Sequence, residues 1–297
     1  MIYCGLESMS SVGRLYQADK NIRQGDEIMK QKFKQLNAFT LAEGGHSPLL
    51  CGDAGTQGSP HLVKGGFTLA EVLITLGVIG VVAAMTMPTL IANHREKQTV
   101  AQLKKFMSVF DQAIKLTSVT EGDIADWQYE TDKPALEFYE KIKPNLKLIR
   151  DCGITSYCIC PNCENNSLKY AYGDGTATGN FLLYTAFSSG ILVDGSTFWL
   201  EIPSKDCTLD MGESKALKHV CGVVDYDING PEKGPNSMGQ DFFYFWITRY
   251  GVIPRGTSLD TNSPIETTCL KDGLKYGCAA WVVYKENMDY LKKDIAW

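Results

Sequence analysis

Oxygen-bearing side chains recur at alternate positions in one acidic segment of the sequence, DYDING. Asp225, Asp227, Asn229 and Gly230 match the opening of an EF-hand calcium loop. The twelfth position of such a loop needs a glutamate that ligates through both oxygens, but Asn236 stands there. This departure argues against an EF-hand. Two interpretations remain: another kind of calcium site, or a polar turn whose side chains accept hydrogen bonds from their own backbone.

A second group of reactive side chains is formed by closely spaced cysteines. Cys158, Cys160 and Cys163 form a C-x-C-x-x-C pattern, and Cys152 lies six residues upstream. Four thiolates could hold zinc or an iron–sulfur cluster. The spacing is not that of paired C-x₂-C ligands, however, and no histidine lies nearby. We therefore favour disulfides at these positions over a metal.

The cysteine count as a whole also favours disulfides. The chain has ten cysteines, and an even number concentrated after residue 150 indicates an oxidising compartment. Proximity in the sequence suggests the pairs Cys207–Cys221 and Cys269–Cys278, whereas the other pairings stay open. The candidates for disulfide formation are Cys152, Cys158, Cys160, Cys163, Cys207, Cys221, Cys269 and Cys278.

A third chemical feature is the isolated carboxylate of Glu71. It directly precedes 21 uncharged, mostly apolar residues, Val72–Ala92. A carboxylate inside a hydrocarbon layer costs about 2.5–3.5 kcal/mol, so such a residue usually has a function. The alternative is a capping box, because Thr68 and Glu71 fit the S/T-x-x-E pattern that begins many ordinary helices.

The sequence contains no motif of a familiar catalytic site. It lacks a nucleophile elbow, a phosphate-binding loop and an H-E-x-x-H pattern, and its four histidines are scattered. We therefore expect no enzymatic activity and no required cofactor, calcium being the only ion that the residues suggest. The net charge of −5 does not indicate a nucleic-acid partner.

The apolar run after Glu71 is long enough to cross a membrane. Twenty-one helical residues span about 30 Å, the thickness of a bilayer core. The hydrophobic region of a secretory signal is shorter, and few globular cores use so long an uninterrupted run. We therefore predict a membrane span. The basic residues Arg95, Lys97, Lys104 and Lys105 that follow it would by themselves place its C-terminal side in the cytoplasm, whereas the cysteines favour the opposite.

The segment GG-FTLAEVLITLGVIGVVAAMTMPTL closely resembles the prepilin-type cleavage and methylation segment of type IV pilins and type II secretion pseudopilins. Gly66 stands where prepilin peptidase cuts, Phe67 would become the new N-terminus, Glu71 follows four residues later, and Pro88 falls where pilin helices kink. The resemblance implies cleavage between Gly66 and Phe67 and N-methylation of Phe67. It also implies that Glu71 pairs with the N-terminal ammonium of a neighbouring subunit during assembly.

The same resemblance implies partners and a location. The partners are prepilin peptidase, other pilin or pseudopilin subunits and an inner-membrane assembly platform. The chain would cross the inner membrane once with its head outside the cytoplasm, and would then enter a filament at the cell surface or in the periplasm. A pseudopilin-like turn would also add Asp241 to a calcium site with Asp225, Asp227 and Asn229.

The expected function is a structural subunit of a type IV pilus-like or type II secretion pseudopilus filament. One alternative is a minor tip pilin or membrane-anchored head that captures DNA or another ligand or mediates adhesion. A single-pass membrane enzyme ranks last because the sequence lacks a catalytic constellation. The echo FTLAE at residues 39–43 has no apolar run after it, so we expect no function for it.

Four regions follow from this interpretation. Residues 1–66 are a leader, or an N-terminal extension from a misassigned start, that processing removes. Residues 67–92 form a transmembrane and filament-core helix, and residues 93–119 continue it as an amphipathic helix. Residues 120–297 form a globular α+β head with disulfides.

Periodicity predicts the helices that position these residues. Apolar side chains at steps of three and four make one stripe on a helix over 67–119, with a kink at Pro88. The stripe consists of Val100, Leu103, Phe106, Phe110, Ala113 and Leu116. A second helix is predicted within 130–152, with Asp132 as its cap, Pro134 in its first turn and a break at Pro144.

The rest of the chain is predicted to be β-structure. Residues 190–202 hold two β-rich runs around Asp194-Gly195, which is typical of a two-residue hairpin turn. Residues 219–228, 241–248 and 278–285 read as three further strands. A long helix followed by an antiparallel sheet gives an α+β fold with the helix packed on the sheet.

Overall fold

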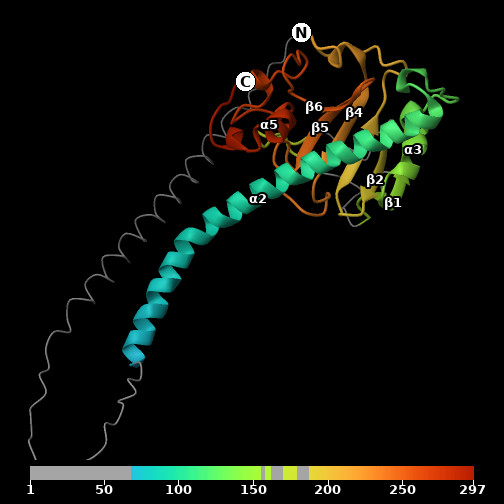
Figure 1. Ribbon diagram of the computed structural model, residues 1–297. Helices are drawn as coiled ribbons and strands as arrows, with labels where there is room; N and C mark the ends of the chain where they lie inside the picture. Colours follow the sequence, from blue (N-terminus) through green and yellow to red (C-terminus); the bar gives the residue numbers. More distant parts are fainter. Residues whose placement is uncertain (1–67, 155–157, 162–169, 179–186) are drawn as a thin grey trace, which may run out of the picture. The chain divides into compact units, whose positions relative to one another are not determined.

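The computed structural model describes residues 68–154, 158–161, 170–178 and 187–297 (Figure 1). The chain divides between Gly66 and Phe67 into two units, and the second unit holds all the described residues. Its longer elements are α2 (Leu69–Glu121), α3 (Pro134–Ile142), β1 (Leu148–Gly153), β2 (Ser188–Leu192), β3 (Thr197–Glu201), β4 (Val220–Asp227), β5 (Phe242–Thr248), β6 (Gly251–Pro254), α4 (Ile265–Thr268) and α5 (Cys278–Lys285). Short 3₁₀ turns lie at Ile124–Asp126, Lys143–Asn145, Leu217–His219 and Asp289–Leu291.

Helix α2 is continuous over 53 residues and agrees with the predicted long helix. It keeps Pro88 inside it and ends at Gly122, whose φ of 83° leaves the helical region. Figure 1 shows α2 bending between its first half and the half that runs along the sheet. A proline inside a helix removes one backbone hydrogen bond and crowds the preceding turn, so Pro88 accounts for a bend.

The six strands form one antiparallel sheet in the order β1-β2-β3-β4-β5-β6. Each strand pairs with its neighbour in the sequence, as in a meander. Strand β5 pairs with β4 on one side and with the edge strand β6 on the other, and all seven of its residues are buried. A strand buried on both faces needs apolar side chains at successive positions, which explains the unbroken apolar run FFYFWI.

Alternate residues of the central strands face two different layers. Phe198 and Leu200 of β3, with Phe243 and Phe245 of β5, belong to the main hydrophobic core beneath α2. A smaller cluster contains Trp199 of β3 and Phe242 and Tyr244 of β5, packed with Cys152, Ile159, Cys160 and Tyr170. The period of two along each strand therefore divides the aromatic side chains between the two faces of the sheet.

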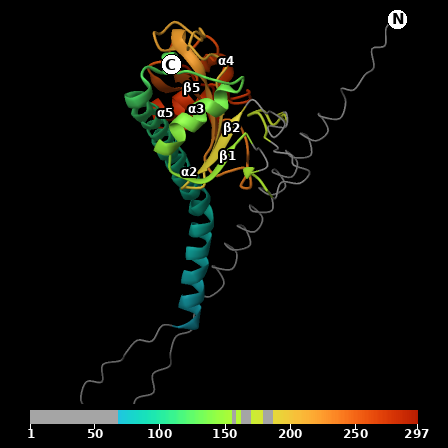
Figure 2. The ribbon, with the colours of Figure 1, turned by 90° about the vertical axis from the view of Figure 1, so that its right-hand side faces the viewer.

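The second half of α2, with α3 and α5, covers one face of the sheet (Figure 2). The predicted stripe from Val100 to Ala113 is buried as expected, and Phe106 stacks on Tyr226 of β4 with ring centroids 3.9 Å apart. Leu116 is an exception because 57% of its surface is exposed. Its neighbour Thr117 is buried in its place and donates its hydroxyl to the Ala113 carbonyl at 2.9 Å.

Two predictions about residues 130–152 were wrong in detail. Helix α3 begins after Lys133, and no side chain caps it, so Asp132 is not the cap. Glu137 instead accepts the backbone N–H groups of Glu130 and Thr131, each at 2.6 Å. The helix ends at Ile142 before Pro144, as expected, but Leu148–Gly153 then forms the edge strand β1.

The predicted strand at residues 278–285 is helix α5. Its buried residues Ala279, Val282 and Val283 follow helical spacing, and the helix packs against α2 and β6. The hairpin at Asp194-Gly195 exists, but Leu192 and Ser196 close a three-residue turn around it: Gly195 donates to Leu192, and Leu192 to Ser196. Gly195 adopts φ 84°, which explains the glycine at this position.

Candidate functional site

The first half of α2 is apolar and exposed around its whole circumference. Leu69, Ile79 and Leu90 are 77%, 63% and 70% exposed. The helix is long and apolar enough to cross a membrane, and its most apolar window is not buried in the structure. Among the described residues nothing covers this surface, and exposed apolar surface of this extent is typical of segments that contact a lipid bilayer or other proteins.

Two threonine hydroxyls inside the apolar half form hydrogen bonds within the helix. The Thr75 hydroxyl donates to the Val72 carbonyl at 3.0 Å, and the Thr86 hydroxyl to the Val82 carbonyl at 3.0 Å. This back-bonding allows a hydroxyl to lie in an apolar medium without a partner from another chain. Glu71 is thus the one ionisable side chain in the first 24 residues of α2.

Glu71 and Thr68 form a complete capping box at the start of α2. One Glu71 carboxylate oxygen accepts the Thr68 N–H at 2.8 Å and the Thr68 hydroxyl at 2.9 Å. The Glu71 N–H donates to the Thr68 hydroxyl oxygen at 3.2 Å. The carboxylate keeps its negative charge without a cationic partner among the described residues, so an attractive site for a cation remains after the cap is formed.

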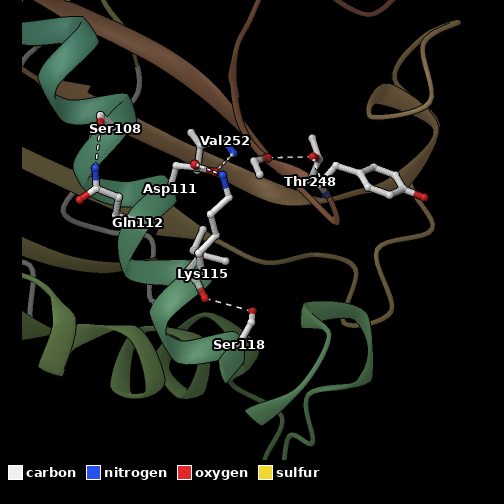
Figure 3. Close-up of polar contacts among 10 residues, drawn as sticks. Ser108, Asp111, Gln112, Lys115, Ser118, Thr248 and Val252 are labelled. Atoms are coloured by element: carbon white, nitrogen blue, oxygen red, sulfur yellow. Dashed lines mark hydrogen bonds and ion pairs between the residues drawn. The ribbon is translucent and has the colours of Figure 1, made fainter. Parts of the chain in front are cut away.

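Asp111 fastens the second half of α2 to the β5–β6 turn (Figure 3). Its Oδ1 accepts the Val252 N–H at 3.2 Å, and its Oδ2 lies 2.6 Å from Lys115 Nζ. A Cβ added to Gly251 would lie 2.4 Å from Asp111 Oδ1, so the backbone approaches the carboxylate only because this residue is glycine. Asp111 therefore positions the sheet against the helix.

Further polar contacts join α2 to distant parts of the head, residues 120–297. Glu96 accepts the Met288 N–H at 2.8 Å, Lys105 lies 2.8 Å from Asp194, and Lys104 pairs with Glu286. The second half of α2 is thus bound to the head along its length, whereas the first half makes none of these contacts. The sequence did not indicate which acidic residues of the helix would face the head.

The carboxylates of the predicted calcium segment hold turns together. Asp227 accepts the N–H groups of Asn229 and Gly230 at 3.1 and 2.8 Å, and the Tyr170 hydroxyl at 2.6 Å. Asp241 accepts the N–H groups of Asn236 and Ser237 at 2.8 and 2.7 Å. These contacts are those of a polar turn, in which side chains satisfy backbone donors.

The residues present do not fit a calcium ion. Calcium takes six to eight oxygen ligands, but the oxygens of Asp227 and Asp241 are already occupied by N–H and O–H donors. Among the described residues no three Asp, Glu, His or Cys side chains are grouped as metal ligands. The structure therefore favours the polar turn over the predicted site of Asp225, Asp227, Asn229 and Asp241.

Asp225 is buried in the sheet between Trp199 and Tyr244, its cross-strand neighbours. Its Oδ1 has no hydrogen-bond partner in the described part of the chain. Burial raises the pKa of Asp225 to about 8, although the nearby Arg255 guanidinium opposes this rise. Burial also raises the pKa of Asp227 to about 7. Protonation of these carboxyl groups therefore makes their burial less costly.

Disulfides link several of the candidate cysteines. The structure contains Cys152–Cys158, Cys207–Cys221 and Cys269–Cys278, so both pairs expected from proximity are present. Cys160 is also disulfide-bonded, whereas Cys163 lies outside the described residues. Cysteines bound in disulfides offer no thiolate to zinc or to an iron–sulfur cluster, which argues against the metal interpretation.

Lys275 is a buried cation that sequence reasoning missed. Its ammonium donates to the carbonyls of Gly173, Lys271 and Gly273 at 3.0, 2.7 and 3.2 Å. Its side chain lies against Gly173 and Gly239, where a Cβ would come within 3 Å of it. No sequence signal marks a lysine whose partners are backbone carbonyls of its own turn and of the distant Gly173.

The predicted processing residues Gly66 and Phe67, the leader and its FTLAE echo lie outside the described residues. Glu71 and Pro88 lie within α2, in its first turn and near its middle.

Comparison with known proteins gives one family match. No curated protein and no solved structure matches the chain. Residues 89–250 match a family of unknown function, DUF6613, and this range extends from the middle of α2 to the turn between β5 and β6. The match includes the helix half that packs on the sheet and excludes Glu71 and all but the last few residues of the apolar half. Because it spans more than half of the 297 residues, the chain belongs to the family of unknown function DUF6613.

Proposed function

We propose that this protein is a membrane-anchored filament subunit of the type IV pilin or pseudopilin class. The supporting observation is the division of α2 into an exposed apolar half and a half packed on a disulfide-bonded sheet. The apolar half serves first as a membrane anchor and then as part of a helical filament core. The rest of α2 holds the head at a fixed position on that core.

Glu71 gives this proposal its chemical basis. An uncompensated carboxylate in an apolar environment raises the free energy of an unassembled subunit, and a cation of a neighbouring subunit lowers it again. The capping box with Thr68 satisfies hydrogen-bond donors but does not neutralise the charge. The resemblance to prepilins assigns the cation to the N-terminal ammonium of processed Phe67.

The disulfides support a location of the head outside the cytoplasm. Three bridges join pairs of described residues in the head, Cys160 is disulfide-bonded as well, and disulfides persist mainly in oxidising compartments. With the head outside, the leader lies in the cytoplasm, where prepilin peptidase of the resembled families cuts.

The experiment is mass spectrometry of the N-terminal peptide from membrane fractions of cells with and without prepilin peptidase. We expect N-methylated Phe67 as the first residue only when the peptidase is present. Gly66→Val should block cleavage, whereas Gly65→Ala serves as the matched control and should be cleaved. An intact Gly66–Phe67 bond in cells with active peptidase would refute the proposal.

A further inference from the structure

Some charged side chains of α2 form no ion pair with the described residues of the head. They lie at separate heights along the helix axis, which we call levels. Glu71 lies in the first turn, and Arg95 and Lys97 follow the apolar half. Both cations are exposed and have no ion-pair partner among the described residues. Glu96 between them accepts the Met288 N–H at 2.8 Å, so it faces the head.

Four exposed acidic residues lie at and just after the C-terminal end of α2. We call them the distal acidic cluster, and they are Glu121, Asp123, Asp126 and Glu130. Glu121 and Asp123 contact Lys141 and Arg249 at 2.6 and 3.0 Å, while the other two have no ion pair among the described residues. The cluster thus retains a net negative charge that another chain can contact.

The three levels are separated by equal intervals. Lys97 follows Glu71 by 26 positions (97 − 71), and Glu121 follows Arg95 by 26 positions (121 − 95). Asp123 follows Lys97 by the same number (123 − 97). At 1.5 Å per residue the two intervals that lie within α2 are each about 39 Å along the helix axis, and Asp123 lies just past the end of α2. One axial displacement therefore brings Glu71 of one helix level with Lys97 of another, and brings Arg95 and Lys97 level with the distal acidic cluster, which keeps a net negative charge beside Lys141 and Arg249.

We propose that neighbouring copies of this chain pack with parallel α2 helices displaced by about 26 residues, or ~39 Å. Glu71 of one copy then lies level with Lys97 of the next, and Arg95 of the first copy lies level with Glu121 of the next. This register deepens the proposed filament function and rests on it. It also gives the Glu71 carboxylate a second cationic partner besides the N-terminal ammonium.

Other arrangements of two helices fit the charges less well. Parallel helices without displacement place Glu71 beside Glu71 and the cations beside one another, and like charges repel. Antiparallel helices also bring Glu71 to Lys97, but they leave Lys97 far from Asp123. Moreover, copies inserted into a membrane by one route share one orientation.

Carbodiimide coupling of the full chain in assembled filaments tests this register. The reagent joins a carboxylate directly to a lysine amine in ion-pair contact. A Glu71–Lys97 or Lys97–Asp123 amide must join two copies, because the residues of one copy are about 39 Å apart. We expect both amides by peptide mass spectrometry. Lys97→Arg is the matched control: it keeps the charge and assembly but loses both amides.

The outcomes separate the register from the proposed function. If filaments form from processed subunits but Lys97 couples only to other carboxylates of neighbouring copies, the register is wrong and the filament function stands. A Glu71–Lys97 amide without Lys97–Asp123 indicates antiparallel packing and also overturns the register. If no filaments containing this chain exist, both proposals fail.

A charge exchange gives a second, independent measurement. Arg95→Glu places like charges level with the distal acidic cluster, and we expect it to lower the assembled fraction about tenfold. Adding Glu121→Lys to the same chain should restore assembly to within about twofold of wild type. Equal loss in the single and double variants, with both proteins folded and membrane-inserted, contradicts the register.

Discussion

Thr68 and Glu71 hydrogen-bond each other in both directions at the start of α2. The Glu71 carboxylate accepts the N–H and the hydroxyl of Thr68, and the Thr68 oxygen accepts the Glu71 N–H. The Glu71 carboxylate thus has two distinct properties. It accepts the hydrogen bonds that cap the start of the helix, and it carries a negative charge that no described cation neutralises. Substitutions can separate the two.

The first prediction distinguishes capping from charge. Thr68→Ala removes the cap, which costs about 1 kcal/mol of helix stability, but leaves the carboxylate. Glu71→Gln keeps an oxygen acceptor for the Thr68 N–H and removes the charge. We expect Thr68→Ala to assemble almost normally and Glu71→Gln to assemble about tenfold less, because it loses the free energy that charge pairing supplies. Immunoblots of sheared filaments, normalised to total protein, measure the ratio. Equal assembly of both variants refutes a role for the charge.

The second prediction concerns the contact between Asp111 and Val252. Asp111→Ala leaves the N–H of buried Val252 without its acceptor, and we expect a loss of about 1–3 kcal/mol in the free energy of unfolding. Lys115→Ala is the control, since it removes only an exposed i,i+4 ion pair worth about 0.5 kcal/mol or less. Thermal unfolding of the detergent-solubilised full chain measures both. A loss with Lys115→Ala as large as that with Asp111→Ala contradicts this account.

The long helix and the central strands could be predicted because their periodicity is strong. The stripe from Val100 to Phe110 has one period over several turns, and strands β3, β4 and β5 are rich in aromatic and β-branched residues. The stripe failed only at Leu116, near the end of α2. There α3 and the adjoining turn contact the helix, and Thr117 bonds to the Lys141 carbonyl.

Elements decided by tertiary contacts were not predictable. CAAWVVYK has a strand-like composition, yet contacts of its buried Val282 and Val283 with the main core favour a helix. β1 is an edge strand with exposed Ile149 and Arg150, so it lacks the alternation that marks a half-buried strand. The polar turn at Asp227 looked like a calcium loop because both use oxygen atoms at alternate positions.

The third prediction compares two disulfides by the length of the loop that each closes. Cys207 and Cys221 are 14 residues apart and fully buried, whereas Cys152 and Cys158 are 6 residues apart. Loop-closure entropy gives stabilisation of about 3 kcal/mol for the first and about 2 kcal/mol for the second. We expect the Cys207→Ala/Cys221→Ala variant to melt at the lower temperature of the two. The reverse order, with the remaining bridges intact by mass spectrometry, contradicts the prediction.

The last prediction is that the head becomes less stable as pH rises from about 4 to about 8, the interval over which Asp225 titrates. Burial raises the pKa of Asp225 from 3.8 to about 8, so the folded state holds its proton where the unfolded state has released it. A group whose pKa is raised by folding stabilises the folded state fully at any pH below its pKa in the unfolded state. This stabilisation is lost as the pH rises toward its pKa in the folded state. Asp227, with a pKa of about 7, acts in the same direction.

Asp225→Asn removes the ionisation while nearly keeping the shape, so its melting temperature should vary less with pH than that of the wild type. Asp206→Asn is the control. Hydrogen bonds from Ser204 and Thr208 lower the pKa of exposed Asp206, so this carboxylate is ionised in the folded and the unfolded state above about pH 5. Its replacement should therefore not change how the melting temperature depends on pH. Melting curves of the full chain in detergent at pH 4.5, 6.5 and 8.5 measure these slopes. An Asp225→Asn slope equal to that of the wild type would show that Asp225 is already ionised in the folded sheet, held by the Arg255 guanidinium.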